Sequence, residues 1–166
     1  MPAMDNAARH ADQLDRATAT LRAPAAAFRR KVISLLDGPT ARDTRADVAA
    51  ARLLLGHYQR AQRRTGVHWS YLAAIHLVET RMGRIRGVST AGALGPMQFL
   101  PTTWDLYGAG GDIRDPGDAI LAAGRLLVAN GAPGDMADAL WHYNPSDAYV
   151  GAVLSYARTM RRSPSA

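Results

Sequence analysis

Residues 69–83 read WSYLAAIHLVETRMG, and this apolar stretch holds the only glutamate of the chain. Of the 14 acidic residues, the other 13 are aspartates. The apolar residues recur at helical spacing, which predicts a helix that ends at the final glycine of the stretch. One face of this helix carries residues spaced three, four and three apart: Leu72, Ile75, Glu79 and Met82. Because that face is otherwise apolar, we expect the Glu79 side chain to point toward the core.

A carboxyl group in this position has two interpretations. If it is desolvated, its pKa rises and it can hold a proton near neutral pH, as a general acid must. Alternatively, Glu79 lies at the edge of the apolar stripe and reaches water or pairs with Arg81 or Arg84. Periodicity does not fix the rotation of a helix to within one residue, so the helix alone leaves both interpretations open.

The composition indicates one helical domain with at most a small appendage. A chain of 166 residues is expected to have a single core. Hydrophobic residues make up 48% of it, and the many alanines and leucines among them favour helices. The absence of cysteine excludes disulfides, thiolate metal sites and a cysteine nucleophile.

The net charge of +6 comes entirely from the first part of the chain. Residues 1–65 carry 12 Lys and Arg against 6 Asp, whereas residues 66–166 carry 8 basic and 8 acidic groups. A basic segment can approach nucleic acid, anionic lipid or an anionic wall polymer. Since no aromatic residues are interleaved with the basic ones, we favour a solvated arginine-rich face and expect no nucleic-acid partner.

Two kinds of targeting segment are not expected in this sequence. No run approaches the roughly 18 apolar residues of a membrane span. Met1–Arg30 is polar and lacks the apolar core of a signal peptide. We therefore expect neither a transmembrane segment nor a signal peptide in this chain.

Proline and glycine divide the chain into helical blocks, with no alternating strand of useful length. We expect an all-α fold with an N-terminal helical extension at residues 1–42 and a main domain at residues 43–162. Asp115 followed by Pro116 is a typical helix start, and Thr44 with Asp47 resembles a capping box. The predicted helices cover residues 5–22, 25–36, 44–65, 69–83, 96–107 (with a break at Pro101 and Thr102 as a cap), 115–131, 135–143 and 144–160.

A second informative segment begins ten residues after Glu79, where residues 89–104 read STAGALGPMQFLPTTW. Its small residues let the backbone approach a ligand closely, and Gln98 offers both a hydrogen-bond donor and an acceptor. Taken alone, a glycine-rich turn before a buried helix more often reflects packing. A functional role for this segment is supported by its position after Glu79 and by Tyr143-Asn144 further along the chain.

Together these motifs resemble the catalytic domain of the soluble lytic transglycosylases and their goose-type-lysozyme-like relatives. That family combines a helix ending in Glu-Ser, a later Ser, the pattern Gly-Ala-x-Gly-x-Met-Gln-x-x-Pro-x-Thr, and Tyr-Asn at the end of a helix. The resemblance covers about residues 45–160, is closest to the membrane-bound branch and to actinobacterial members, and implies a lysozyme-like catalytic domain. In the same order this chain has Glu79-Thr80, Ser89, the segment 92–102 and Tyr143-Asn144.

The resemblance implies that Glu79 is both the catalytic acid and the catalytic base. It also implies that five residues bind the N-acetylmuramic acid side of the scissile bond: Ser89, Met97, Gln98, Tyr143 and Asn144. The reaction would cleave the β-1,4 bond between N-acetylmuramic acid and N-acetylglucosamine in peptidoglycan. Glu79 would protonate the glycosidic oxygen and then deprotonate the 6-hydroxyl of the same sugar, which closes a 1,6-anhydro ring. One carboxylate suffices because the attacking hydroxyl is intramolecular.

The same resemblance implies the partner, the cofactor requirement, the oligomeric state and the location of the protein. We expect peptidoglycan glycan strands as the partner, and no cofactor or metal. We expect the protein to be a monomer that acts outside the cytoplasm, either secreted or associated with the cell wall. The chain departs from the family pattern in two places, since Thr80 replaces the common Ser and Pro145 follows Tyr-Asn. Arg84 and Arg86, in the gap before Ser89, either steer anionic peptide stems or face water.

Three alternatives to this function are considered. In a muramidase of the goose-type-lysozyme class, Asp105 or Asp112 would position a water molecule, because an ordinary glycosidase uses a second carboxylate. Metal binding has one weak indication, His76-x-x-Glu79, which lacks the helical zinc spacing, and we discount it. The third alternative is a non-catalytic cell-wall-binding helical module that uses its basic first 65 residues.

Overall fold

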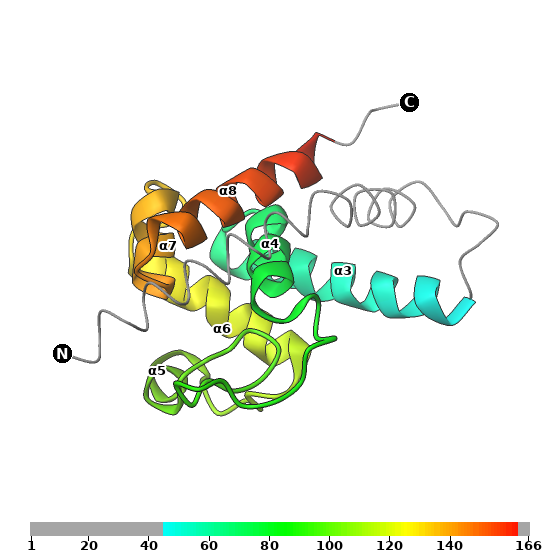
Figure 1. The fold of residues 1–166 in the computed structure, drawn as a ribbon. Coiled ribbons are helices and arrows are strands. Elements are labelled where there is room, and N and C mark those ends of the chain that lie inside the picture. Colours follow the sequence, from blue (N-terminus) through cyan, green and yellow to red (C-terminus); the bar gives the residue numbers. More distant parts are fainter. Residues whose placement is uncertain (1–44, 163–166) are drawn as a thin grey trace.

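The computed structural model describes residues 45–162 of the chain. This part contains six helices and no strand, so the predicted all-α fold class is confirmed there (Figure 1). None of these helices has the length and apolar character needed to cross a membrane. The extension predicted for residues 1–42, its two helices and the Thr44 cap lie outside the described residues. The helices are α3 (Arg45–Thr65), α4 (Trp69–Thr80), α5 (Pro101–Tyr107), α6 (Pro116–Ala129), α7 (Met136–Tyr143) and α8 (Asp147–Arg161).

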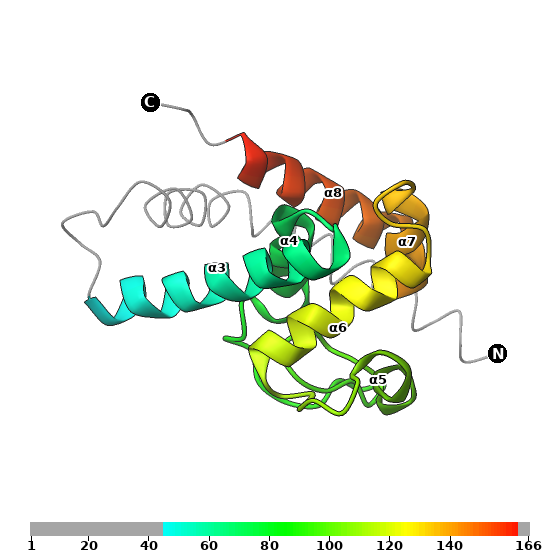
Figure 2. The same ribbon diagram turned by 180° about the vertical axis from the view of Figure 1, so that it is seen from behind.

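Helix α4 lies in the middle of the helical assembly (Figures 1 and 2). It packs against α8, α3 and α6, and α3 and α6 also pack against each other. Helix α7 contacts both α6 and α8, and α5 lies against α6. All six residues from Leu72 to Leu77 are buried. The helix is therefore enclosed on most of its surface, rather than on the single face that the periodicity predicted.

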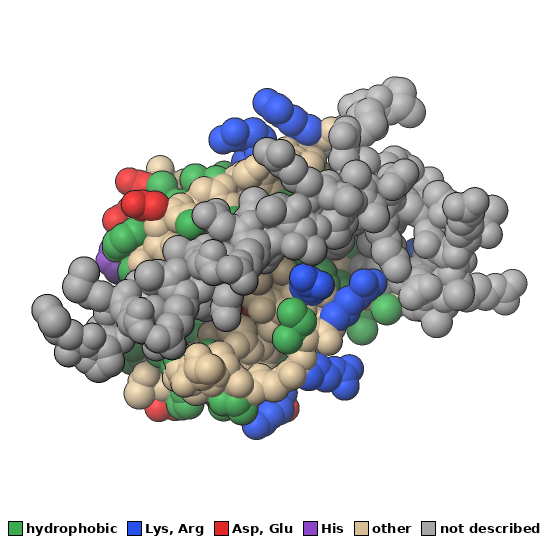
Figure 3. Space-filling view, viewed as in Figure 1, with side chains coloured by type: hydrophobic (Ala, Val, Ile, Leu, Met, Phe, Trp, Pro, Cys, Tyr) green, Lys and Arg blue, Asp and Glu red, His purple; other side chains and the backbone are tan. Residues whose placement is uncertain are grey.

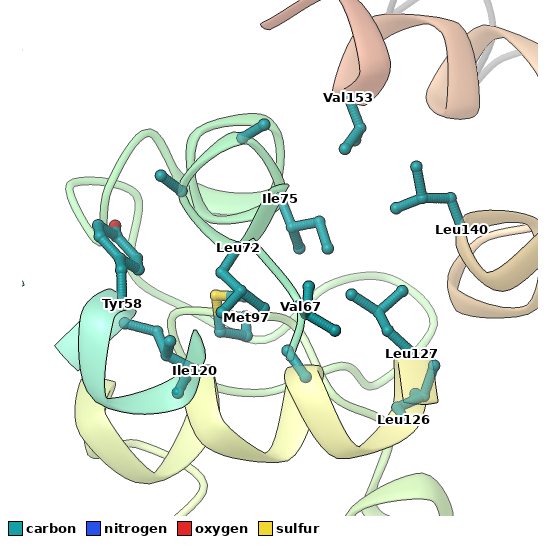
Figure 4. Close-up of a cluster of buried hydrophobic side chains, with 14 of the residues drawn as sticks. Tyr58, Val67, Leu72, Ile75, Met97, Ile120, Leu126, Leu127, Leu140 and Val153 are labelled. Atoms are coloured by element: carbon teal, nitrogen blue, oxygen red, sulfur yellow. The ribbon is translucent and has the colours of Figure 1, made fainter. Parts of the chain in front are cut away.

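The core combines side chains from the helices and from the segment predicted as the second motif. Figure 4 shows Leu72 and Ile75 of α4 among side chains from α6, α7 and α8, with Met97 beside Leu72. Leu72, Ile75 and Met97 are fully buried. Burial of one side chain of this size stabilises the fold by about 1.5–3 kcal/mol. Because Met97 belongs to this core, the segment around it has a fixed position relative to α4.

Three helices begin at an aspartate or serine whose side chain caps the helix. Asp115 accepts a hydrogen bond from a backbone N–H three residues further on, and Pro116 is the first residue of α6, as predicted. Asp135 and Ser146 cap α7 and α8 in the same way. Because Ser146 is the cap, α8 begins three residues later than the predicted start at residue 144.

Two helices end within two residues of a glycine that has a positive φ. Helix α3 ends at Thr65, and Gly66 follows it with a φ of 76°, as predicted. Helix α6 ends at Ala129, two residues before the predicted end. There Asn130 holds the C-cap position and Gly131 has a φ of 103°. The positive φ explains why the helix does not continue to the glycine.

Helix α4 ends three residues earlier than predicted. Its last residue is Thr80, after which Arg81, Met82 and Gly83 have φ values of 52°, 62° and 75°. The amides of the first two bond back to carbonyl groups in the last turn of α4, which satisfies acceptors that a helix end leaves open. The apolar spacing continues through Met82, although the backbone has already left the helix.

The helix predicted from residue 96 is helical only from Pro101. Before it, Leu94 and Phe99 pair as an isolated antiparallel bridge that closes a tight turn. Pro101 suits the first helical position because its missing N–H would have no partner there. Thr102 is not the cap; Leu100 holds that position and makes no side-chain hydrogen bond.

Gly95 lies where two loops meet at backbone level. It has a φ of 75°, and a Cβ atom at this position would overlap the carbonyl oxygen of Ile113. The backbone of the second motif therefore rests directly on the loop that precedes α6. Only glycine combines this φ with this close approach.

We expect Gly95→Ala to lower the free energy of unfolding by about 3 kcal/mol, because it adds both φ strain and backbone overlap. Gly92→Ala is the matched control. Gly92 has a φ of 83°, but a Cβ atom added there would have no heavy atom within 4 Å. In Gly92→Ala, φ strain alone should therefore lower the free energy of unfolding by about 1 kcal/mol. Urea unfolding of both variants measures the difference, and equal losses would contradict the close approach at Gly95.

Candidate active site

The carboxyl group of Glu79 lies near the C-terminal end of α4. Part of the residue remains accessible to solvent, but protein atoms surround the carboxyl group. This desolvation raises its pKa from 4.5 to about 7. The Tyr149 hydroxyl acts in the opposite direction, because it stabilises the carboxylate and lowers the pKa. Since desolvation is the larger effect, Glu79 carries a proton for much of the time near neutral pH.

The alternative position of Glu79, at the edge of the helix and paired with an arginine, is not what the described residues show. Arg81 and Arg84 are exposed, and neither forms an ion pair with Glu79. The one ion pair found between described residues joins His142 and Asp138 on α7, 3.6 Å apart. The Glu79 carboxyl therefore has polar neighbours but no cationic partner within residues 52–162.

The polar neighbours of Glu79 are two tyrosines, of which Tyr149 is buried and Tyr143 is partly buried. Tyr143 ends α7 and Tyr149 lies in the first turn of α8, and their rings stack with centroids 6.2 Å apart and planes 8° apart. Burial raises the pKa of both hydroxyl groups well above the usual value, and the charge of Glu79 raises them further. Both tyrosines therefore stay protonated and can act only as neutral hydrogen-bonding groups.

The two tyrosine hydroxyls differ in their partners. The Tyr143 hydroxyl donates to the carbonyl oxygen of Met97 at 2.7 Å. The Tyr149 side chain is 1% exposed, and within the described residues its hydroxyl completes no hydrogen bond. It faces Glu79 closely enough to lower the pKa of the carboxyl, so its proton is available to a carboxylate that forms there.

Hydroxyl groups from two helices hold the Pro96–Met97 segment. Thr80, the neighbour of Glu79, donates to the carbonyl oxygen of Pro96 at 2.7 Å and accepts from the amide of Gly83 at 3.0 Å. Tyr143 donates to the next carbonyl, that of Met97. The second motif is thus tied to both the end of α4 and the end of α7, on either side of Glu79.

The structure brings together only some of the predicted site residues. Glu79, Tyr143 and the Met97 backbone form one group, although the Met97 side chain points into the core. Gln98 instead bonds to the carbonyl of Gly95 at 2.9 Å, and its own φ is 52°. The remaining two, Ser89 and Asn144, stabilise local turns: Ser89 Oγ accepts from the Ala93 amide, and the Asn144 carbonyl accepts from the Ser146 amide.

Aromatic side chains extend the group around Tyr143. Phe99 packs edge-on against Tyr143 and Trp104, with centroid distances of 5.9 and 5.4 Å. Trp69 and Trp104 are half-buried against the core, whereas Trp141 is 41% exposed on α7. Among the three tryptophans, Trp141 therefore has the most surface free to meet a ligand.

The two candidates for a second carboxylate are Asp112 and Asp105. Asp112 has another role, and Asp105 has no partner among the described residues. Asp112 Oδ1 accepts from the Arg114 amide, and Asp118 Oδ2 accepts from the Asp112 amide, so both close the loop before α6. Asp105 is exposed on α5. None of them is among the groups that shift the pKa of Glu79.

A second polar cluster lies one turn before Glu79. His76 is 1% exposed, and its Nδ1 lies 2.7 Å from the Tyr58 hydroxyl, which itself donates to the Met82 sulfur at 3.0 Å. Desolvation lowers the pKa of His76 to about 4 and raises that of Tyr58, so both are neutral at pH 7. This cluster packs the turn that follows Glu79. No group of three or more possible metal ligands occurs among the described residues.

Two residues of the group around Glu79 were not predicted as site residues. Tyr149 lies in the last predicted helix, residues 144–160, and Thr80 is one of the two departures from the family pattern. The available signal was that a carboxyl buried in an apolar helix needs polar neighbours, and hydroxyl-bearing residues in apolar segments are the natural source.

We expect the replacement Glu79→Gln to stabilise the fold increasingly as the pH rises. The folded state holds the Glu79 proton up to about pH 7, whereas an ordinary glutamate has a pKa of 4.5. The stability that this bound proton gives the wild-type fold is therefore present at low pH and is lost as the pH rises through 7. The shift corresponds to at most about 3 kcal/mol, and solvent contact reduces it to about 1–2 kcal/mol. Glutamine carries no charge at any pH.

Urea unfolding of wild type and Glu79→Gln at pH 5 and pH 8 measures this effect. The advantage of the variant should be about 1–2 kcal/mol larger at pH 8. Asp105→Asn is the control, since Asp105 is exposed and its replacement should change stability equally at both pH values. A constant difference between Glu79→Gln and wild type would show that the carboxyl is not desolvated.

Comparison with protein-family models, with curated proteins and with solved structures finds no match for this chain. The resemblance to the lytic transglycosylases is therefore carried by the motifs of the sequence itself.

Proposed function

We propose that this protein is a peptidoglycan lytic transglycosylase with a lysozyme-like catalytic domain. The observation that carries the proposal is the desolvated carboxyl of Glu79, whose pKa is raised to about 7 beside the hydroxyls of Tyr143 and Tyr149. A group with this pKa can give up a proton and take one back near neutral pH. The family motifs place the same glutamate in the catalytic role.

The first step is proton donation. The protonated Glu79 gives its proton to the oxygen of the β-1,4 bond between N-acetylmuramic acid and N-acetylglucosamine, and the bond from the anomeric carbon to that oxygen breaks. Glu79 becomes a carboxylate in a desolvated site. The Tyr149 hydroxyl, which completes no hydrogen bond within the described residues, faces Glu79 and can stabilise this charge.

The second step returns the proton to Glu79. The carboxylate takes the proton of the 6-hydroxyl of N-acetylmuramic acid, and that oxygen attacks the anomeric carbon to form the 1,6-anhydro ring. No water is consumed, and Glu79 is protonated again. Because the attacking hydroxyl belongs to the same sugar, its high effective concentration replaces the second carboxylate of an ordinary glycosidase.

Other predicted residues would bind the substrate. The proton of the Tyr143 hydroxyl is used by the Met97 carbonyl, so Tyr143 offers its oxygen as an acceptor, which suits the N–H of an acetamido group. The positive charge that develops at the anomeric carbon would be met by that same N-acetyl group. Ser89, Gln98 and Asn144 would contact the glycan at the edges of the site. The substrate, glycan strands, places the protein outside the cytoplasm, where a monomer is sufficient.

Hydrolysis by a goose-type-lysozyme-like muramidase is the second candidate. It would need Asp105 or Asp112 to activate water. Asp112 is engaged in the loop before α6 and Asp105 is exposed, so neither supports this reaction as well as Glu79 alone supports ring closure. A non-catalytic wall-binding module does not require a carboxyl of raised pKa.

Mass spectrometry of muropeptides released from purified peptidoglycan tests the proposal. We expect wild type to release products one water lighter than those of a lysozyme, and Glu79→Gln to release at least about a thousandfold less, since no other group replaces its proton transfers. Asp105→Asn and Asp112→Asn are controls that should keep nearly full activity.

The other outcomes identify the competing functions. Reducing-end products that disappear with Asp105→Asn or Asp112→Asn would establish a hydrolase. Binding of peptidoglycan without release of any product, equally by wild type and Glu79→Gln, would establish a binding module.

The pH dependence of kcat/KM provides a separate test of Tyr149. The rate should fall above about pH 7, where Glu79 loses its proton. In Tyr149→Phe the carboxylate loses a stabilising hydroxyl, so the pKa of Glu79 rises and the alkaline limb moves to higher pH, while the maximal rate falls. Tyr156→Phe, on the same helix α8, is the matched control and should leave the limb in place. If the alkaline limb of the pH profile stays at the same pH in Tyr149→Phe, Tyr149 does not stabilise the Glu79 carboxylate.

A further inference from the structure

The segment that follows α4 is an exposed loop with a distinctive composition. We call residues 81–88, RMGRIRGV, the arginine loop. Three of its eight residues are arginines, and the chain has no acidic residue between Glu79 and Asp105. The loop therefore carries a local charge of +3, although residues 66–166 as a whole are neutral.

The base of the arginine loop is firmly held. The Ile85 amide donates to the carbonyl of Thr80 at 2.9 Å, and the Gly83 amide donates to the Thr80 hydroxyl at 3.0 Å. At the other end, Ser89 pairs with Ala93 through two hydrogen bonds of 3.0 Å. The arginine loop is thus fixed at both ends, at a turn that begins immediately after Glu79 and at Ser89.

The tip of the loop exposes large apolar side chains. Ile85 is 55% exposed and Val88 is 65% exposed, and both are β-branched side chains that a folded protein usually buries. Arg81, Arg84 and Arg86 surround them and are also exposed. Within residues 52–162 none of these arginine side chains forms an ion pair or a hydrogen bond. In Figure 3 basic and hydrophobic side chains lie next to one another where Figure 1 places the loop after α4.

We propose that the arginine loop docks the protein on the surface of an anionic lipid bilayer. Phosphate groups of the lipids would pair with Arg81, Arg84 and Arg86, and Ile85 and Val88 would enter the boundary between headgroups and acyl chains. The combination of the two residue types favours this partner. An anionic glycan or peptide would satisfy the arginines but would leave both apolar side chains in water.

This inference is independent of the proposed catalytic activity, because it uses no residue of the group around Glu79. A contact made by a few side chains at the boundary between headgroups and acyl chains is reversible. Since the loop is joined directly to the end of α4, docking would hold the Glu79 end of that helix close to the membrane.

Partitioning of the full chain onto vesicles tests the proposal. The vesicles contain equal parts of phosphatidylglycerol and phosphatidylcholine, with pure phosphatidylcholine as the neutral comparison. We expect Ile85→Ser/Val88→Ser and Arg84→Gln/Arg86→Gln each to weaken binding to the anionic vesicles at least about tenfold. The matched controls are Leu53→Ser/Leu106→Ser, which removes exposed leucines elsewhere, and Arg63→Gln/Arg64→Gln in the last turn of α3. Both controls should bind within about twofold of wild type.

A fluorescent label reports directly on insertion. The chain has no cysteine, so Val88→Cys accepts a single environment-sensitive thiol label, and Leu106→Cys, on α5, is the control position. Anionic vesicles should shift the emission of the label at position 88 to shorter wavelength and leave that at position 106 unchanged.

Several results would overturn the proposal. These are no binding to anionic vesicles, equal binding by the loop variants and wild type, and no shift of the label at position 88. A loss of binding with Arg63→Gln/Arg64→Gln but not with the loop variants would assign the contact to the basic first part of the chain. Binding that depends on the arginines but not on Ile85 and Val88 would point to a purely ionic partner instead.

Discussion

The desolvation of the Glu79 carboxyl is the constraint on which the rest of the described structure depends. Removing this group from water would be costly if it were charged, so the fold holds it as an acid with a pKa of about 7. This requires α4 to be covered by α3, α6 and α8, and its six consecutive buried residues show that it is. It also requires polar neighbours that carry no charge, which Tyr143 and Tyr149 provide because their own pKa values are raised well above the usual value.

The same hydroxyl chemistry fixes the loop beside the carboxyl. Thr80 and Tyr143 donate to consecutive carbonyl groups, those of Pro96 and Met97, and the Met97 side chain fills the core below them. Gly95 brings the other side of this segment against the loop before α6. A short segment without regular structure is thus positioned by two helices, a buried side chain and one backbone contact. Such multiple anchoring is what a preorganised site needs.

Thr80 also marks the boundary between two environments. On its N-terminal side α4 is buried and neutral, whereas on its C-terminal side the chain turns through three left-handed residues into an exposed, positively charged loop. The His76 and Tyr58 cluster packs this turn from below. The proposed chemistry and the proposed membrane contact therefore occupy adjacent but separate parts of the chain, and a rigid turn connects them.

The sequence by itself determined the helical class of the described residues, the Asp115 cap of α6 and the glycine stop of α3, because each follows from local backbone chemistry or from composition. Composition also singled out Glu79 as the only glutamate of the chain. The sequence did not determine where α4 ends, since apolar periodicity runs on through Met82 while the backbone has already turned. It also did not show that Tyr149 lies beside Glu79 or that the Thr80 hydroxyl donates to the Pro96 carbonyl. Only the tertiary structure decided these points, because they depend on how α4, α7 and α8 meet, and sequence spacing carries no information about contacts between distant segments. Desolvation is likewise a property of the assembled helices, so the raised pKa of Glu79 could be expected from the sequence but was fixed only by the fold.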